Sequence, residues 1–328
     1  RVRVAFMRRK YFLSGLIAVV VAGILLIPVG GSSPEPREAS PAKVRAIDMS
    51  DYEATTPGSP LHLLFIHHSC GGQLLAPPGD DIGEQCIYQS HPNGGGLRPL
   101  LEREGYLVHE VSYGSEIGDK TDIFDWLPKF RLAMEKVLTA SGPDTYDSDG
   151  IRNDVVAFKP CFPNNWFVAA GTPPGTPEGP ELTVANAKAA YSALLPEFAK
   201  HPEVLFVAVT APPLARKVDS EPLWKVLARK VLSKPRRDVT QTGPLARQFN
   251  NWLKAEDGWL QDYPQRTVVV FDYYDILTDA GASNVLRYPT GPDGSDSHPS
   301  APGNAKAAQA FVPLLTRAVR RAELIEGN

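Results

Sequence analysis

The sequence has few cysteines and no paired cysteine motif. Three of its 328 residues are cysteine, Cys70, Cys86 and Cys161, and no two of them are spaced as C-x-x-C. This spacing argues against a structural zinc site. Because the number is odd, at least one thiol stays unpaired within the chain.

The sequence also lacks a basic stripe in its main body and has no internal repeat. The formal net charge is -3, and five basic residues, Arg1, Arg3, Arg8, Arg9 and Lys10, precede residue 11. The remainder is therefore more acidic than the whole chain. This balance argues against a nucleic acid partner.

Charge is absent from residues 11–29, which form one long apolar run. With its basic flank on the amino-terminal side, this run predicts a membrane segment that exports the rest of the chain. The run is longer than a signal-peptide core and no A-x-A site follows, so residues 1–30 favour a signal anchor, with a cleaved signal peptide as the alternative. Residues 31–60 are rich in proline and serine and predict an extended linker to a domain at 61–328.

Within that domain, short apolar runs alternate with helical patterns. Such runs are typical of strands buried on both faces of a parallel sheet, and they span residues 61–66, 106–111, 154–158, 204–209 and 267–271. Helical spacing covers residues 97–104, 121–137, 184–198, 245–253 and 301–322, and Pro128 is expected to kink or divide the second of these. Residues 77–96 predict a loop, and 212–237 an insertion with a helical centre. The pattern predicts an α/β fold, a three-layer α/β/α domain with a five-stranded parallel sheet.

Polar residues follow the predicted strands, at the edge where open α/β sheets bind ligands. They are Ser69 after the first strand, Gly114 after the second, Asn164 and Asn165 after the third, and Asp296 with His298 just before the last helix.

Acyl transfer needs a nucleophile, a base, a group that orients the base, and donors aimed at the developing oxyanion. Ser69 is the candidate nucleophile and His298 the candidate base. Asp296 would hold the second ring nitrogen of His298, with Asp293 as the competing acid. Cys70, at the start of a helix, is an alternative nucleophile.

The order of these blocks resembles the SGNH (GDSL-like) hydrolase family over residues 61–322, most closely in the final block DSHPSAPGNAKAA. The resemblance implies a flavodoxin-like strand order and a serine esterase that needs no metal or other cofactor. It also implies an oxyanion hole built from the backbone N–H groups of Ser69 and Gly114 and the amide of Asn164, with Asn165 as the alternate.

Three departures mark a divergent branch of that family. The first block reads HHS instead of G-D-S, the third reads KPCFPNN instead of G-x-N-D, and Ser295 stands where D-x-x-H would place the acid.

The expected strand order also bears on the cysteines and histidines near the site. It places Cys70 close to Cys161, with Cys86 as the rival partner for a disulfide. His67 and His68 point in opposite directions, so one at most faces the crevice. With no third ligand nearby, we predict no metal site, and metal-assisted hydrolysis through His67 and His68 is the alternative. His68 and Cys161 are expected to support the Ser69 turn.

Five aromatic residues, Tyr88, Tyr113, Trp126, Trp166 and Phe167, lie on segments that could approach the crevice mouth. Exposed aromatic rings beside a hydrolytic site favour sugars as ligands. The sequence therefore predicts an extracytoplasmic, membrane-anchored or secreted serine ester hydrolase acting on O-acyl (acetyl) groups of a carbohydrate or envelope polymer. The alternative is a non-catalytic glycan-binding module on the same fold.

Overall fold

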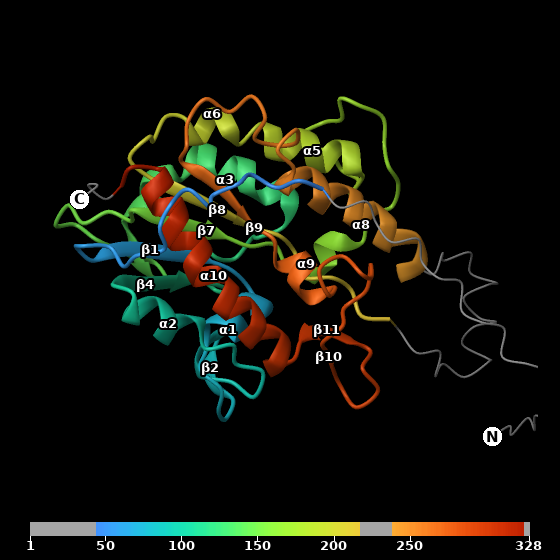
Figure 1. Cartoon of the computed structure of the whole chain (residues 1–328), viewed down its shortest axis with the longest axis horizontal. Helices are drawn as coiled ribbons and strands as arrows, with labels where there is room; N and C mark the ends of the chain where they lie inside the picture. The colour runs from blue at the N-terminus through green and yellow to red at the C-terminus, as the bar shows by residue number, and fades with distance from the viewer. Residues whose placement is uncertain (1–43, 217–237, 325–328) are drawn as a thin grey trace, which may run out of the picture. The chain divides into compact units, whose positions relative to one another are not determined.

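A five-stranded parallel sheet forms the centre of this computed structural model, which describes residues 44–216 and 238–324 (Figure 1). The strands are β1 (Leu61–Ile66), β4 (Tyr106–Val111), β7 (Val155–Phe158), β8 (Leu205–Val209) and β9 (Val268–Phe271). They lie in the order β4-β1-β7-β8-β9, and every adjacent pair is parallel. This flavodoxin-like order and the five strands confirm the predicted sheet.

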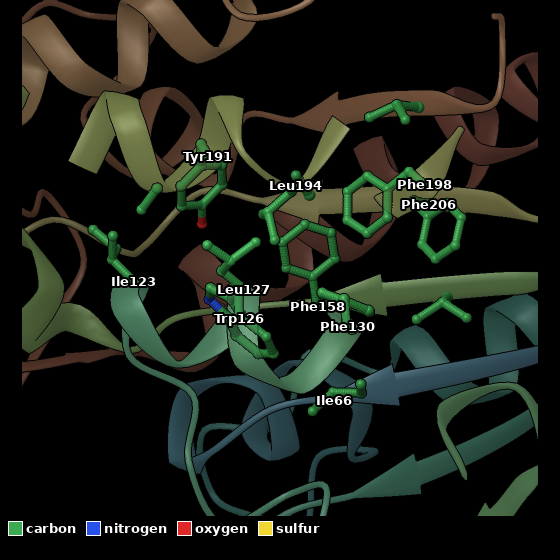
Figure 2. Packing of buried hydrophobic residues seen from close by; sticks show 14 of the residues in the cluster. Ile66, Ile123, Trp126, Leu127, Phe130, Phe158, Tyr191, Leu194, Phe198 and Phe206 are labelled. Carbon is green, nitrogen blue, oxygen red and sulfur yellow. The ribbon is translucent and has the colours of Figure 1, made fainter. Parts of the chain in front are cut away.

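The inner strands of the sheet, β1, β7 and β8, are buried on both faces because they are apolar at successive positions. Neighbouring residues of a strand point to opposite faces. Leu64 and Ile66 of β1 accordingly belong to one hydrophobic core, whereas Leu63 and Phe65 belong to the other. Figure 2 shows the first core, where the Phe130 ring packs edge-on against Phe158 at a centroid distance of 5.1 Å.

Helices cover each face and complete the predicted three layers (Figure 1). The first core is covered by α3 (Trp126–Leu132), α4 (Met134–Thr139), α5 (Val184–Ser192), α6 (Leu195–Phe198) and α8 (Val239–Lys254). The second is covered by α1 (Ser69–Leu75), α2 (Leu97–Arg103) and α10 (Ala301–Arg321). Helix α9 (Tyr273–Leu277) follows β9 and contributes side chains to both cores.

The predicted break at Pro128 is wrong. Pro128 is the third residue of α3, in the first turn, where a helix does not need the missing N–H group. The chain instead divides at Ala133, which separates α3 from α4 and has a φ of -129°. A short 3-10 turn, η1 (Ile123–Asp125), precedes α3.

Residues 77–96, predicted to be a loop, contain a hairpin of β2 (Ile82–Glu84) and β3 (Ile87–Ser90). Its turn residues Gln85 and Cys86 have φ values of 52° and 65°, a left-handed conformation that ordinary propensities do not signal. Two further two-stranded sheets pair β5 (Ala140–Gly142) with β6 (Thr145–Tyr146) and β10 (Pro289–Thr290) with β11 (Asp296–Pro299).

The second half of the predicted linker, residues 44–60, contacts the domain. Ala46 forms an antiparallel bridge with Ala255, and Ile47 and Met49 pack against the two cores. The Arg317 guanidinium donates to the carbonyl of Tyr52 at 3.2 Å. This stretch is therefore bound along the folded domain.

Two predictions fall on parts of the chain that the structure leaves undescribed. The predicted membrane segment, residues 11–29, lies outside the described residues, as do residues 217–237 of the predicted insertion. Within 44–216 and 238–324, no helix combines the length and apolar character that crossing a bilayer requires.

Candidate active site

The carboxyl end of β1 runs directly into helix α1. His67 and His68 follow Ile66, the last residue of β1, and Ser69 is the first residue of α1. In the first turn of a helix the backbone N–H of Ser69 has no intrahelical acceptor. Ser69 therefore presents both a hydroxyl and a backbone donor at the carboxyl edge of the sheet.

A hydrogen-bonded chain joins Ser69 to two residues from the end of the domain. Ser69 Oγ lies 2.9 Å from Nε2 of His298, a residue 229 positions away on β11. The Nδ1 atom of that ring lies 2.7 Å from Oδ1 of Asp296, which also accepts the backbone N–H of His298 at 3.0 Å. The structure thus brings together the three residues predicted as nucleophile, base and orienting acid.

The charge state of Asp296 suits it to hold the ring. Partial burial acts to raise the pKa of Asp296, but the hydrogen bonds from His298 outweigh it, so the pKa lies below its usual value. An ionised carboxylate on Nδ1 keeps the hydrogen there and leaves Nε2 to accept the Ser69 hydroxyl.

Asp293, the competing acid, lies in the turn before β11. Its Oδ1 accepts the backbone N–H of Ser295 at 3.1 Å and the Ser295 hydroxyl at 2.6 Å. These bonds shape the exposed turn, and Asp296 takes the position beside His298.

Two of the three predicted oxyanion donors, Gly114 and Asn164, are engaged elsewhere. The N–H of Gly114, in a left-handed turn with φ of 77°, points to Asp119 Oδ1 at 3.3 Å. The Asn164 amide donates to Asp122 at 2.8 Å and to the Cys161 carbonyl at 3.2 Å. Both amide hydrogens of Asn164 are therefore already bonded, and its oxyanion role stays a prediction.

Asn165 is more deeply committed to the fold. Its amide donates to the carbonyls of Ala211 and Pro212 at 3.0 and 2.8 Å, and its oxygen accepts the amide of Asn250. These bonds tie the end of β7 to the segment after β8, which is a structural role.

Two thiols lie against the nucleophile. Cys161 Sγ is 3.6 Å from Ser69 Oγ and 3.5 Å from Cys70 Sγ, and both cysteines are buried. The hydrogen bond with Cys70, aided by the charge of Lys159, holds the pKa of Cys161 well below its usual value, although burial opposes this. The predicted proximity of Cys70 and Cys161 is present, and all three cysteines are free thiols in the structure.

His68 supports the neighbouring loop rather than the nucleophile itself. Its Nε2 atom lies 2.9 Å from the carbonyl oxygen of Gly118, and its ring stacks on Tyr113 at a centroid distance of 3.6 Å. Burial lowers the pKa of His68, which favours the neutral ring. Although it is stacked on His68, Tyr113 is exposed to solvent.

The other predicted aromatics divide between the core and its margin. Trp126 and Phe167 are buried in the first hydrophobic core, so neither reaches the crevice mouth. Tyr88 and Trp166 are half-buried. Phe162 contacts the triad, with its ring edge-on to His298 at a centroid distance of 5.1 Å, and no sequence pattern indicated this contact.

His67 and His68 have separate partners. His67 Nε2 lies 2.9 Å from Glu110 Oε2, on the neighbouring strand β4. Among the residues that the structure describes, no group of three or more His, Cys, Asp and Glu side chains is placed to bind a metal ion.

Glu110 and its partner Arg98 are residues near the site that the sequence analysis missed. A signal was present, because Glu110 interrupts the apolar strand run YLVHEV at residues 106–111. A carboxylate inside a buried strand requires a cation or several donors.

No protein-family model and no curated protein matches this chain. Among solved structures, it is similar to a carbohydrate esterase family 2 enzyme plus carbohydrate binding domain from Corynascus thermopiles (Myceliophthora fergusii), with 14% identity over 81% of this chain and 68% of that one and a TM-score of 0.39. It is also similar to an acetylxylan esterase from Geobacillus stearothermophilus, with 14% identity, 84% and 100% coverage and a TM-score of 0.38. With TM-scores below 0.5, these likenesses do not bear on the activity of this chain.

Proposed function

We propose that this protein is a serine ester hydrolase that works through an acyl-enzyme on Ser69. The observation that carries the proposal is the continuous chain from Ser69 Oγ through the His298 ring to Asp296. A serine hydroxyl is a weak nucleophile by itself, and a neutral imidazole at hydrogen-bonding distance activates it.

The reaction follows from this geometry. Ser69 Oγ attacks the ester carbonyl carbon while its proton passes to His298 Nε2. The tetrahedral intermediate collapses as His298 returns that proton to the departing alkoxide, leaving an acyl group on Ser69. Water, deprotonated by His298, then attacks the acyl carbon, and His298 passes the proton to Ser69 Oγ as the carboxylic acid is released. Asp296 stabilises the imidazolium in both steps. The backbone N–H of Ser69 is the donor best placed for the oxyanion.

We further propose an O-acyl, specifically acetyl, group on a carbohydrate or envelope polymer as the substrate. The exposed Tyr113 ring lies beside the site and supports a sugar as the alcohol part of the ester. A sugar ring can stack on the face of an aromatic side chain. The extracytoplasmic location rests on the sequence of residues 1–30.

Replacing Ser69 with alanine tests the proposal. We expect the rate of acetate release from acetylated oligosaccharides and from p-nitrophenyl acetate to fall by about 10³-fold or more, because members of a triad act as a unit. Ser192→Ala, at the exposed end of α5, is the matched control and should keep the parental rate. Equal rates for the parent and Ser69→Ala would reject the proposal.

A non-catalytic glycan-binding module is the second candidate. The observation that favours it is the prior engagement of Gly114 and Asn164, which leaves the oxyanion site short of donors. A fluorophosphonate probe separates the two functions, because it labels a serine only when a base activates it. Labelling of the parent at Ser69 supports the hydrolase, and its absence supports the binding module.

A further inference from the structure

A chain of hydrogen-bonded polar side chains ends at the turn that carries Ser69. It begins at Arg98 on α2, whose Nη2 atom donates to Glu110 Oε1 at 2.5 Å. The other carboxylate oxygen of Glu110 lies 2.9 Å from Nε2 of His67. His67 is fully buried and Glu110 is 8% exposed, so bulk water has little access to either side chain.

Both ring nitrogens of His67 face oxygen acceptors. Nε2 faces the Glu110 carboxylate, and Nδ1 lies 3.0 Å from the carbonyl oxygen of His68. The ring therefore lies between an oxygen of strand β4 and an oxygen of the turn that carries Ser69.

The carboxylate at the centre of this chain is stabilised in its charged form. Burial acts to raise the pKa of Glu110, but the hydrogen bond and charge of His67 and the charge of Arg98 outweigh it, and the pKa is lowered. Arg98 also donates to the carbonyl of Val108 at 2.7 Å, so the guanidinium is fixed to the strand as well as to the acid.

The first turn of α1 rests on the His67 ring. A Cβ atom added at Gly71 would lie 2.3 Å from His67 Cβ, so the glycine permits direct contact between the helix backbone and the ring. The N–H groups of Gly71 and Gly72 donate to the His68 carbonyl at 2.8 and 3.1 Å. His67 and the helix therefore converge on one oxygen, in the residue directly before Ser69.

We propose that the Arg98–Glu110–His67 chain positions the Ser69 hydroxyl for proton transfer to His298. The inference rests on the hydrolase function proposed above. His67 fixes the turn through a hydrogen bond and a packing contact, and Glu110 and Arg98 fix His67 from β4 and α2. These three are positioning residues, since none of them contacts Ser69 Oγ or the substrate.

Glu110→Gln is the direct test, with Glu197→Gln as the matched control. Glu197 of α6 is also 8% exposed, pairs with Arg131 of α3 at 3.1 Å and with Lys200, and contacts no residue of the triad. At a temperature where both variants are folded by circular dichroism, we expect Glu110→Gln to lower kcat and the rate of fluorophosphonate labelling by about 10- to 100-fold. KM should change by less than about threefold, and Glu197→Gln should keep both rates whatever its loss in Tm.

Variants at Arg98 extend the test if Glu110→Gln does not fold. The Arg98 side chain is 23% exposed, so its replacement disturbs the core less. Arg98→Gln should reduce kcat and the labelling rate, and Arg98→Lys, which keeps the charge, should recover part of both.

The outcomes separate this inference from the function on which it rests. A parent that is labelled at Ser69, together with Glu110→Gln and Arg98→Gln labelled at the parental rate, overturns the positioning role and leaves the hydrolase intact. Equal losses of kcat in Glu110→Gln and Glu197→Gln would also overturn it, because the effect would then be one of general stability. A parent that is not labelled rejects the hydrolase itself.

Discussion

Two very different atoms contact the hydroxyl of Ser69. His298 Nε2 at 2.9 Å can take its proton, whereas Cys161 Sγ lies 3.6 Å from the same oxygen. The sulfur limits the positions open to the hydroxyl, and so couples the state of Cys161 to the site. The reactivity of Cys161 toward its neighbour Cys70 can be tested by oxidation.

Oxidation of the purified protein with diamide should join Cys70 to Cys161. Their sulfurs lie 3.5 Å apart, and the lowered pKa of Cys161 favours the thiolate that attacks the oxidant. The two thiols lose two protons and two electrons, diamide takes up both, and one S–S bond forms. Non-reducing peptide mapping should find this bond with Cys86 still alkylatable. A disulfide that contains Cys86 would contradict the observed arrangement.

Asp296→Asn should lower kcat by about 10³-fold, because an amide no longer holds the hydrogen on Nδ1 of His298. Asp293→Asn makes the same chemical change three residues earlier, in the exposed turn, and should stay within about threefold of the parent. The measurement is ester hydrolysis at saturating substrate. The reverse ranking would assign Asp293 as the orienting acid.

The site residues were predicted from their positions along the chain more than from their residue types. Ser69, His298 and Asp296 could be named because each follows a predicted strand or precedes a predicted helix at one edge of the sheet. The sequence could not separate Asp296 from Asp293, because a tight turn decides which acid meets the ring. It also could not show that Asn164 would spend both amide hydrogens on Asp122 and Cys161, since those contacts depend on loop conformation.

Among the elements, α3 holds the loop that follows β4. Lys129 on α3 is 8% exposed, and its ammonium group donates to the carbonyls of Ile117 and Lys120. The next residue after Ile117 is Gly118, whose carbonyl accepts from His68. One buried lysine thus fixes a loop that borders the site.

Lys129 should make the stability of the fold rise between about pH 8 and pH 10. Burial lowers the pKa of Lys129 to about 8, below the ordinary value of about 10.4 that it has when unfolded. In this window the unfolded chain binds the proton that the folded chain has lost, so the free energy of unfolding increases with pH.

The measurement is urea unfolding at pH 7.5 and pH 9.5 for the parent and Lys129→Met. The parent should gain about 2 kcal/mol relative to the variant between these two pH values. Because the comparison is a double difference, the titration of tyrosines common to both proteins cancels. Parallel pH profiles would show that Lys129 does not titrate in this range.

The elements themselves were mostly visible in the sequence. Five apolar runs specified the strands, because burial on both faces demands apolar residues at successive positions. The β2–β3 hairpin was missed, since its turn uses Gln85 and Cys86 at positive φ instead of the glycine or asparagine that usually marks such turns. The predicted break at Pro128 was wrong because a proline breaks a helix only beyond its first turn, and α3 begins just two residues earlier, at Trp126.

In the domain as a whole, the segment before β1 contacts helix α10 and the residues just after helix α8. Arg45 pairs with Glu256 at 3.2 Å just beyond α8, and Arg317 and Arg320 of α10 donate to Tyr52 and Thr55. Residues 44–60 therefore contribute to stability, which a proline- and serine-rich composition does not predict.

A protein that begins at residue 61 should be less stable than one that begins at residue 44. The loss should be about 2 to 4 kcal/mol in the free energy of unfolding, chiefly because Ile47 and Met49 leave the two cores. The exposed pair of Arg45 and Glu256 should add little. Both proteins lack residues 1–43, so the difference in urea midpoint reports on 44–60 alone. Identical midpoints would show that these contacts carry no net energy.

The separation of 229 residues between Ser69 and His298 has a consequence for synthesis. A nascent chain leaves the ribosome with its serine first, and the imidazole follows only after all five strands of the sheet have emerged. Under the proposed mechanism, a growing or prematurely terminated chain carries an inert hydroxyl. Hydrolysis begins only when β11 brings His298 to Ser69, so activity follows the completion of the fold.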